Sequence, residues 1–181
     1  MNNFGLNHIA SQAIYKDLIS GKMINEMEYI DGELVKSTKF RELVNDIDKY
    51  RELYTLLGFI LKDIDSVAYF ITRPDKSNEL NDTAANAQTI LLILSRGIGK
   101  QGIAPGILFD EKSGISTKLV DEIGEETEAA QILKACGMKQ PLSQSLNNTL
   151  LERGLMYKNL DDRCVLSSAG QAMFNRLFSK N

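Results

Sequence analysis

Few residues in this chain could do covalent chemistry. His8 is the only histidine, and the two cysteines, Cys136 and Cys164, lie far apart and form no C-x-x-C pair. A histidine base beside a nucleophile, or a metal held by several histidines and thiolates, would therefore depend on isolated residues. We expect reduced cysteines and a His8 that lies on the surface or at a helix end. No catalytic residue, metal site or cofactor is predicted, so we expect that the protein is not an enzyme.

A glycine-rich stretch at Gly97, Gly99 and Gly102 has the G-x-G-x-x-G spacing of a dinucleotide-binding loop. That loop works where a strand precedes it and a helix follows it, because the helix N-terminus meets the pyrophosphate. Here the apolar spacing before Gly97 predicts a helix, and Lys100 is not followed by the Ser or Thr of a P-loop. The sequence favours a helix end and a loop over a nucleotide site.

Charge is unevenly distributed along the chain. Residues 110–128 hold seven carboxylates against two lysines, whereas residues 131–181 hold seven cations against three carboxylates. The acidic run has two interpretations, a metal or hydrolytic site and a solvated face, and the second is favoured because charge runs usually face water. The basic C-terminal third could approach an anionic polymer, although the net charge of the whole chain is −3.

Polar side chains suited to contact DNA or a partner chain gather around a predicted helix in this basic third. Gln144 and Asn147 lie away from the leucine stripe of that helix, and amides can read adenine edges. Lys139 before the helix, and Lys158 and Arg163 in the hairpin after it, could hold phosphates. These residues form the predicted contact surface. The alternative is a solvated polar face.

In the first half of the chain, the elements that would position these groups are helices followed by a hairpin. Apolar residues recur at helical spacing over residues 7–21 and 40–58, and the second stretch is expected to form one helix of about five turns. Residues 22–35 between them are expected to be irregular or a short strand. β-branched and aromatic runs at 59–64 and 67–73 predict a hairpin.

The second half is predicted to repeat this order. Helices are expected from residue 82 to the glycines that begin at Gly97, from Ser116 to Gly137 around the acidic run, and from Pro141 to Gly154. A second hairpin follows over residues 155–167, and a capping box at Ser168 begins a last helix.

This order predicts an α+β fold, mainly α with short β-hairpins, arranged as tandem winged-helix domains at residues 1–79 and 80–181. No stretch approaches the roughly 18 apolar residues of a membrane span. The first residues also lack the basic and apolar regions of a signal peptide. We therefore expect a cytoplasmic protein.

A likeness to a known family extends over nearly the whole chain. It is clearest at residues 14–24, at residues 40–72 with the following Arg73, and at Leu150-Leu-Glu-Arg-Gly-Leu-Met-Tyr. In apolar spacing and turn placement they resemble the MukE/MksE family, the accessory subunits of bacterial MukBEF-type condensins. The resemblance implies a non-catalytic, nucleoid-associated subunit that forms a homodimer and binds the kleisin subunit. It would help an SMC-type ATPase hold DNA, contacted directly or through the complex, in chromosome organisation. The alternative hypotheses are a stand-alone dimeric winged-helix transcription regulator and, least favoured, a small enzyme built on the acidic run.

Overall fold

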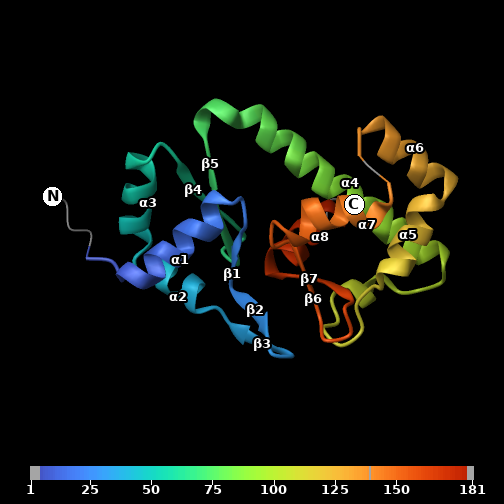
Figure 1. Cartoon of the computed structure of the whole chain (residues 1–181), viewed down its shortest axis with the longest axis horizontal. Helices are drawn as coiled ribbons and strands as arrows, with labels where there is room; N and C mark the ends of the chain where they lie inside the picture. The colour runs from blue at the N-terminus through green and yellow to red at the C-terminus, as the bar shows by residue number, and fades with distance from the viewer. Residues whose placement is uncertain (1–4, 139, 179–181) are drawn as a thin grey trace.

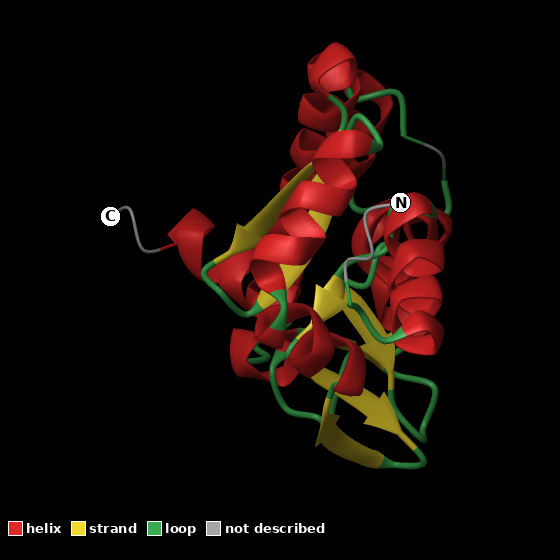
Figure 2. Ribbon diagram, turned by 90° about the vertical axis from the view of Figure 1, so that its left-hand side faces the viewer, coloured by secondary structure: helices red, strands yellow, loops and turns green. Residues whose placement is uncertain are grey.

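The computed structural model describes residues 5–138 and 140–178, with side chains described for these residues except 76–81. Its two halves lie side by side and are joined by the long helix α4 (Ser77–Lys100), which crosses from one to the other (Figure 1). Strands form separate small groups among the helices instead of one continuous sheet (Figure 2). The predicted α+β class, mainly helical with short antiparallel hairpins, is confirmed.

The N-terminal half contains a three-stranded antiparallel sheet and a separate hairpin. Its elements are α1 (His8–Ile19), β1 (Ile24–Asn25), β2 (Met27–Ile30), β3 (Glu33–Lys36), α2 (Thr38–Asn45), α3 (Ile47–Leu56), β4 (Ile60–Ile64), β5 (Ala68–Thr72) and a short 3-10 turn, η1 (Pro74–Lys76). In the sheet, β5 lies between β1 and β4, and β2 pairs with β3. The predicted hairpin is therefore present as β4 and β5. The segment expected to be irregular or a short strand holds three strands.

The prediction of a single helix over residues 40–58 is wrong, because the chain breaks at Asp46. Asp46 has φ −120° and ψ 33°, and it separates α2 from α3. Asp has a low helix propensity, and here its side chain makes no cap hydrogen bond but lies 2.6 Å from Lys49 Nζ. The break lets Leu43 of α2 and the fully buried Tyr50 of α3 enter the same hydrophobic core.

The C-terminal half has more helices and one hairpin. After α4 come η2 (Pro105–Leu108), α5 (Thr117–Glu125), α6 (Thr127–Ala135), α7 (Leu142–Leu146), the π-helical turn η3 (Asn147–Leu151), β6 (Met156–Lys158), β7 (Cys164–Leu166) and α8 (Ser168–Phe178). Ile115 forms an isolated antiparallel bridge with Cys164, so β7 lies between Ile115 and β6. This repeats the strand order β1, β5, β4 of the first half.

Helix α4 passes through Gly97 and Gly99 and ends at Lys100, within the glycine-rich stretch that is expected to break it. A Cβ on Gly97 would lie 2.3 Å from Ile123 Cγ2, so the missing side chain lets α5 approach α4 closely. The glycine therefore serves helix packing. The predicted domain boundary between residues 79 and 80 falls near the start of α4 and stays a prediction.

Two hydrophobic clusters hold the molecule together. The smaller cluster lies between α1, α2, α3 and the sheet, with Ile14, Leu18, Tyr50 and Tyr54 at its centre. The larger cluster fills the C-terminal half and also takes in Ala68 from β5. The two halves are therefore continuous in their packing. Among the described residues, none of the helices has both the length and the apolar character needed to cross a bilayer.

The packing role of Gly97 predicts opposite effects for two glycines of the same helix. Gly97→Ala should lower the free energy of unfolding by about 1–3 kcal/mol through overpacking against Ile123. Gly99 is exposed and has open space where a Cβ would be, so Gly99→Ala should raise that energy by up to about 1 kcal/mol. Urea denaturation of the two variants measures both changes. Equal shifts in the same direction would contradict the proposed packing role.

Candidate functional site

The predicted contact surface is built around α7, which is capped from a neighbouring helix. Leu142 and Leu146 of α7 are buried. The backbone N–H and the hydroxyl of Ser143 donate to the carboxylate of Asp121 in α5, at 2.9 and 3.0 Å. A Cβ on Gly124 would lie 2.5 Å from Leu142 Cβ, which shows how closely α5 and α7 approach. The α5 carboxylate thus satisfies an N-terminal donor of α7 and fixes its orientation.

Three of the predicted contact residues line one surface cavity. Gln144, Asn147 and Lys158 contribute to a depression of about 380 Å³ between η3, α5 and the β6–β7 hairpin, and all three are exposed. Arg163 is exposed on the same hairpin but does not line this cavity. Lys139 lies outside the described residues. The structure therefore brings together three of the five predicted residues.

Carboxylates accompany the cations on this surface. Lys158 Nζ lies 2.7 Å from an Asp162 oxygen, and this hydrogen bond raises the pKa of Lys158. The amide of Asn147 donates to Glu152 at 3.3 Å, and Asp121 is held at the start of α7. The positive charge counted along the C-terminal third is therefore not gathered here. A DNA backbone would meet acids as well as bases, whereas a protein partner can match mixed charges.

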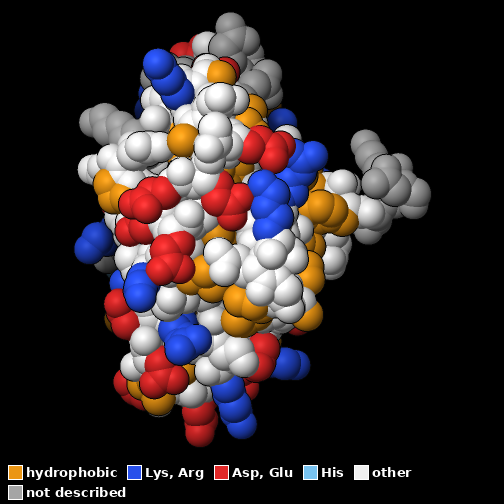
Figure 3. Space-filling model, turned by 90° about the vertical axis from the view of Figure 1, so that its right-hand side faces the viewer, with side chains coloured by type: hydrophobic (Ala, Val, Ile, Leu, Met, Phe, Trp, Pro, Cys, Tyr) orange, Lys and Arg blue, Asp and Glu red, His pale blue; other side chains and the backbone are white. Residues whose placement is uncertain are grey.

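The acidic run ties α6 to α4. Arg96 lies 2.7 Å from Glu128, and Lys100 lies 2.9 Å from Glu126 and 3.3 Å from Glu128. On the face formed by α5 and α6, acidic and basic side chains are intermixed (Figure 3). Across residues 5–138 and 140–178, no group of three or more His, Cys, Asp or Glu side chains is placed to hold a metal ion. Exposed ion pairs of this kind contribute little stability each, and their effect is to orient α6.

The isolated reactive side chains lie apart from one another. His8 is exposed at the start of α1, with Gln12 Nε2 at 3.4 Å from its Nε2 atom. Cys136 is exposed at the end of α6, and Cys164 is buried in β7, where burial raises the pKa of its thiol. Neither cysteine forms a disulfide. The helix predicted to precede the glycine motif is α4, so the motif is not preceded by the strand that a dinucleotide loop needs.

A buried amide joins the two halves at a junction that the sequence does not predict. Asn25 of β1 is only 8% exposed. Its Nδ2 donates to the Gly154 carbonyl at 2.8 Å, and its Oδ1 accepts from the Ala169 N–H at 2.8 Å, in the first turn of α8. The Ser167 hydroxyl donates to the same Gly154 carbonyl at 2.7 Å. One side chain therefore satisfies backbone groups before β6 and at the start of α8.

Three further contacts close the junction around Asn25. The rings of Tyr29 and Tyr157 stack with centroids 4.9 Å apart, so the β2–β3 hairpin packs against β6, and burial raises the pKa of Tyr157 to about 12. The Tyr29 hydroxyl accepts from the Leu160 N–H at 3.3 Å. Between the β4–β5 turn and α8, Asp65 is ion-paired with Arg176. Hydrogen bonds from Arg176 lower the pKa of the Asp65 carboxyl.

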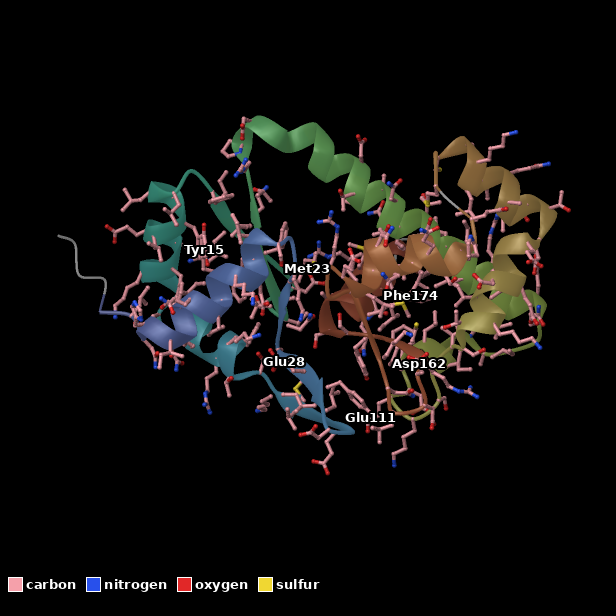
Figure 4. The ribbon with its side chains drawn as sticks, viewed as in Figure 1. Tyr15, Met23, Glu28, Glu111, Asp162 and Phe174 are labelled. Atoms are coloured by element: carbon pink, nitrogen blue, oxygen red, sulfur yellow. The ribbon has the colours of Figure 1, made fainter. Side chains whose placement is uncertain are left out.

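The junction also contains two cavities, which open where the halves meet. One, of about 360 Å³, has a polar and charged lining that includes Asp17, Glu28 and Lys39, with Lys39 Nζ 2.6 Å from Asp17. The other, of about 160 Å³, is apolar, and Met23 borders both. Figure 4 shows Met23 between the two halves and Glu28 lower, on the β2–β3 hairpin. The two halves thus form both of these concave sites together.

The buried amide generates a stability prediction with a matched control. Asn25→Ala should lower the free energy of unfolding by about 2–4 kcal/mol, because it leaves the Ala169 N–H buried without an acceptor and removes one donor from the Gly154 carbonyl. Asn147→Ala removes an exposed amide and should change that energy by no more than about 0.5 kcal/mol. Chemical denaturation measures both variants. A loss as small for Asn25→Ala as for Asn147→Ala would contradict the role assigned to the amide.

Comparison with known proteins identifies one family. A family model described as condensin complex protein MksE matches residues 10–178, which is nearly the whole chain and includes both halves. Among curated proteins, none matches the chain.

Proposed function

The chain belongs to the family of the condensin complex protein MksE, and from this premise we propose that it is a non-catalytic subunit that binds the kleisin and helps hold DNA. Membership makes it a subunit of a condensin complex, with a role in chromosome organisation. The observation that carries the proposal is the match over residues 10–178, because it spans both halves and the junction between them. The ATP chemistry would belong to an SMC-type ATPase partner, and the complex would act at the nucleoid.

Both halves are proposed to be winged-helix domains, divided near residues 79 and 80. The N-terminal half has the element order helix, strand, helix, helix, strand, strand, and the last strand lies between the other two. The C-terminal half follows the same order, with the isolated bridge at Ile115 in the place of the first strand. This order supports the proposal because a winged helix carries its wing as a hairpin after a three-helix core. The β2–β3 hairpin, helix α6 and the last helix α8 are additions to this order.

The surface around α7 is proposed as a contact for a protein partner, with Gln144, Asn147, Lys158 and Arg163 as its polar residues. The acids Asp121, Glu152 and Asp162 near these residues support a protein over DNA, because carboxylates repel phosphates. DNA would then be held mainly through other subunits of the complex. The same acids weaken the alternative of a stand-alone transcription regulator that reads base edges with this helix.

A homodimer is proposed for the free subunit. The end of α3 and the start of β4 expose three large apolar side chains, Leu56, Leu57 and Ile60, at 65%, 50% and 44%. Clustered apolar side chains at a surface are typical of protein–protein contacts, which supports association of two copies.

Sedimentation analysis should give a mass of twice 20.2 kDa. A monomer at all accessible concentrations would contradict this.

Kleisin binding is tested with the purified chain and the kleisin subunit of the same complex. We expect a stable complex on size exclusion, and we expect the double variant Gln144→Ala/Asn147→Ala to weaken it at least fivefold in calorimetry. The variant Gln88→Ala changes an exposed amide on α4 and serves as the control. Failure of the wild-type chain to bind kleisin would overturn the proposed function.

Measurements of DNA binding distinguish a surface that contacts DNA from one that contacts a protein. If Lys158 and Arg163 hold phosphates, changing each to Gln should weaken duplex binding and make the salt slope shallower by about 0.9 per lost contact. Because we propose a protein partner here, we expect Lys158→Gln and Arg163→Gln to change the affinity for kleisin. The weak binding of the chain to duplex DNA should stay at the wild-type level. Sequence-specific binding to an operator by the isolated chain would favour the transcription regulator.

A further inference from the structure

The apolar cavity at the junction has the size of a hydrophobic side chain. Its volume is about 160 Å³, close to the roughly 150 Å³ of an engineered apolar cavity that stays dry and binds benzene. Both halves contribute to it, with Leu18 from α1, Phe70 from β5, Ala84 from α4, Leu155 before β6 and Met173 from α8. An apolar group that entered this cavity would contact both halves at once.

Two unpaired cations accompany this apolar lining. Lys22 and Arg153 are the charged residues that border the cavity. The Arg153 guanidinium lies over Gly21, with Nη1 2.7 Å from where a Cβ on that glycine would be. Within the part of the chain that the structure describes, neither cation has an ion-pair partner, whereas Asp17 near the end of α1 is already paired with Lys39. A bound group that carries a carboxylate would therefore neutralise the positive charge of these two side chains.

We propose that this cavity anchors the kleisin. An extended segment of that subunit inserts one apolar side chain of about the size of Leu, Met or Phe and places an adjacent acidic residue against Lys22 and Arg153. The proposal rests on the kleisin binding proposed above and names the chemistry of the segment: an apolar residue flanked by acid. Because the cavity is lined by α1, β5, α4 and α8, the bound segment fastens the two halves to each other and favours their observed arrangement.

Filling the cavity tests the apolar part of the anchor. Ala84→Leu adds a side chain to the cavity lining and should lower kleisin affinity at least tenfold without lowering the unfolding temperature. Ala85→Leu places the same side chain on the exposed neighbouring position of α4 and should change affinity less than twofold. Calorimetry measures both affinities, and circular dichroism reports folding. A folded Ala84→Leu variant that binds with wild-type affinity overturns the anchor.

Charge reversal tests the acidic part. The double variant Lys22→Glu/Arg153→Glu should lower kleisin affinity at least tenfold at low salt and less at high salt, because charge attraction is screened. Lys62→Glu makes the same kind of change at an exposed position of β4 outside the cavity and is the control. If Ala84→Leu does not fold, the comparison of the double variant with Lys62→Glu still tests the proposal. Equal affinities for the double variant and the control overturn it.

Methionine methyl resonances locate the occupant directly. Met23 and Met173 border the cavity and should shift when kleisin binds, whereas Met138 lies elsewhere and should not. If the wild-type chain forms no kleisin complex, the proposed function and the anchor both fail. If the complex forms without shifts at Met23 and Met173, only the anchor fails. If sodium 3-phenylpropionate alone shifts both methyls while Ala84→Leu leaves kleisin affinity unchanged, a free carboxylate is the occupant and the anchor is overturned.

Discussion

The arrangement of the two halves depends on one buried amide. Asn25 has both a donor and an acceptor, and each finds a backbone group in the other half, at Gly154 and Ala169. A buried amide that lost these partners would carry a desolvation cost without compensation. Apolar contacts allow neighbouring surfaces to slide, but a pair of directed hydrogen bonds allows one register. The amide therefore determines where β1 lies relative to β6 and α8, and the shape of both junction cavities follows from that position.

The β2–β3 hairpin reinforces this register at a distance from Asn25. Its Tyr29 ring stacks on Tyr157, and Gly32, with φ +90°, leaves room for the Leu160 side chain at the tip of the other hairpin. A side chain on Gly32 would collide with Leu160, since a Cβ there would lie 2.8 Å from its Cδ1 atom. Each of these hairpin contacts contributes little stabilising energy. Because they lie far from the Asn25 amide, they nevertheless resist rotation of one half against the other. The insertion between β1 and α2 has a structural purpose in joining the halves.

Most elements could be predicted from the sequence because their apolar residues recur with the period of the helix or strand that they form. The prediction failed where a single residue changes the backbone against that pattern. The apolar stripe continues across Asp46, so periodicity alone could not locate the break between α2 and α3. Gly97 has a low helix propensity, but close packing against Ile123 favours a glycine there, and the helix continues to Lys100. No local sequence pattern marks Asn25 as a junction residue, because the hydrogen-bond partners of its amide lie more than a hundred residues further along the chain.

The candidate contact surface shows a related limit of sequence reasoning, which concerns charge. Counting charged residues over the C-terminal third predicts an electropositive face, but the count leaves out carboxylates from other segments and does not show which charges pair with each other. Asp121 reaches this surface from α5 because the start of α7 needs an acceptor, and Asp162 meets Lys158 because the hairpin folds back at that point. Local folding requirements thus neutralise charges that a DNA-binding surface would keep free. Lys22 and Arg153 differ because no described acid forms an ion pair with them, and the helix end at Gly21 brings them to an apolar cavity. In this chain, the unpaired cations at the junction are better placed to attract an acidic segment than the larger number of cations near α7.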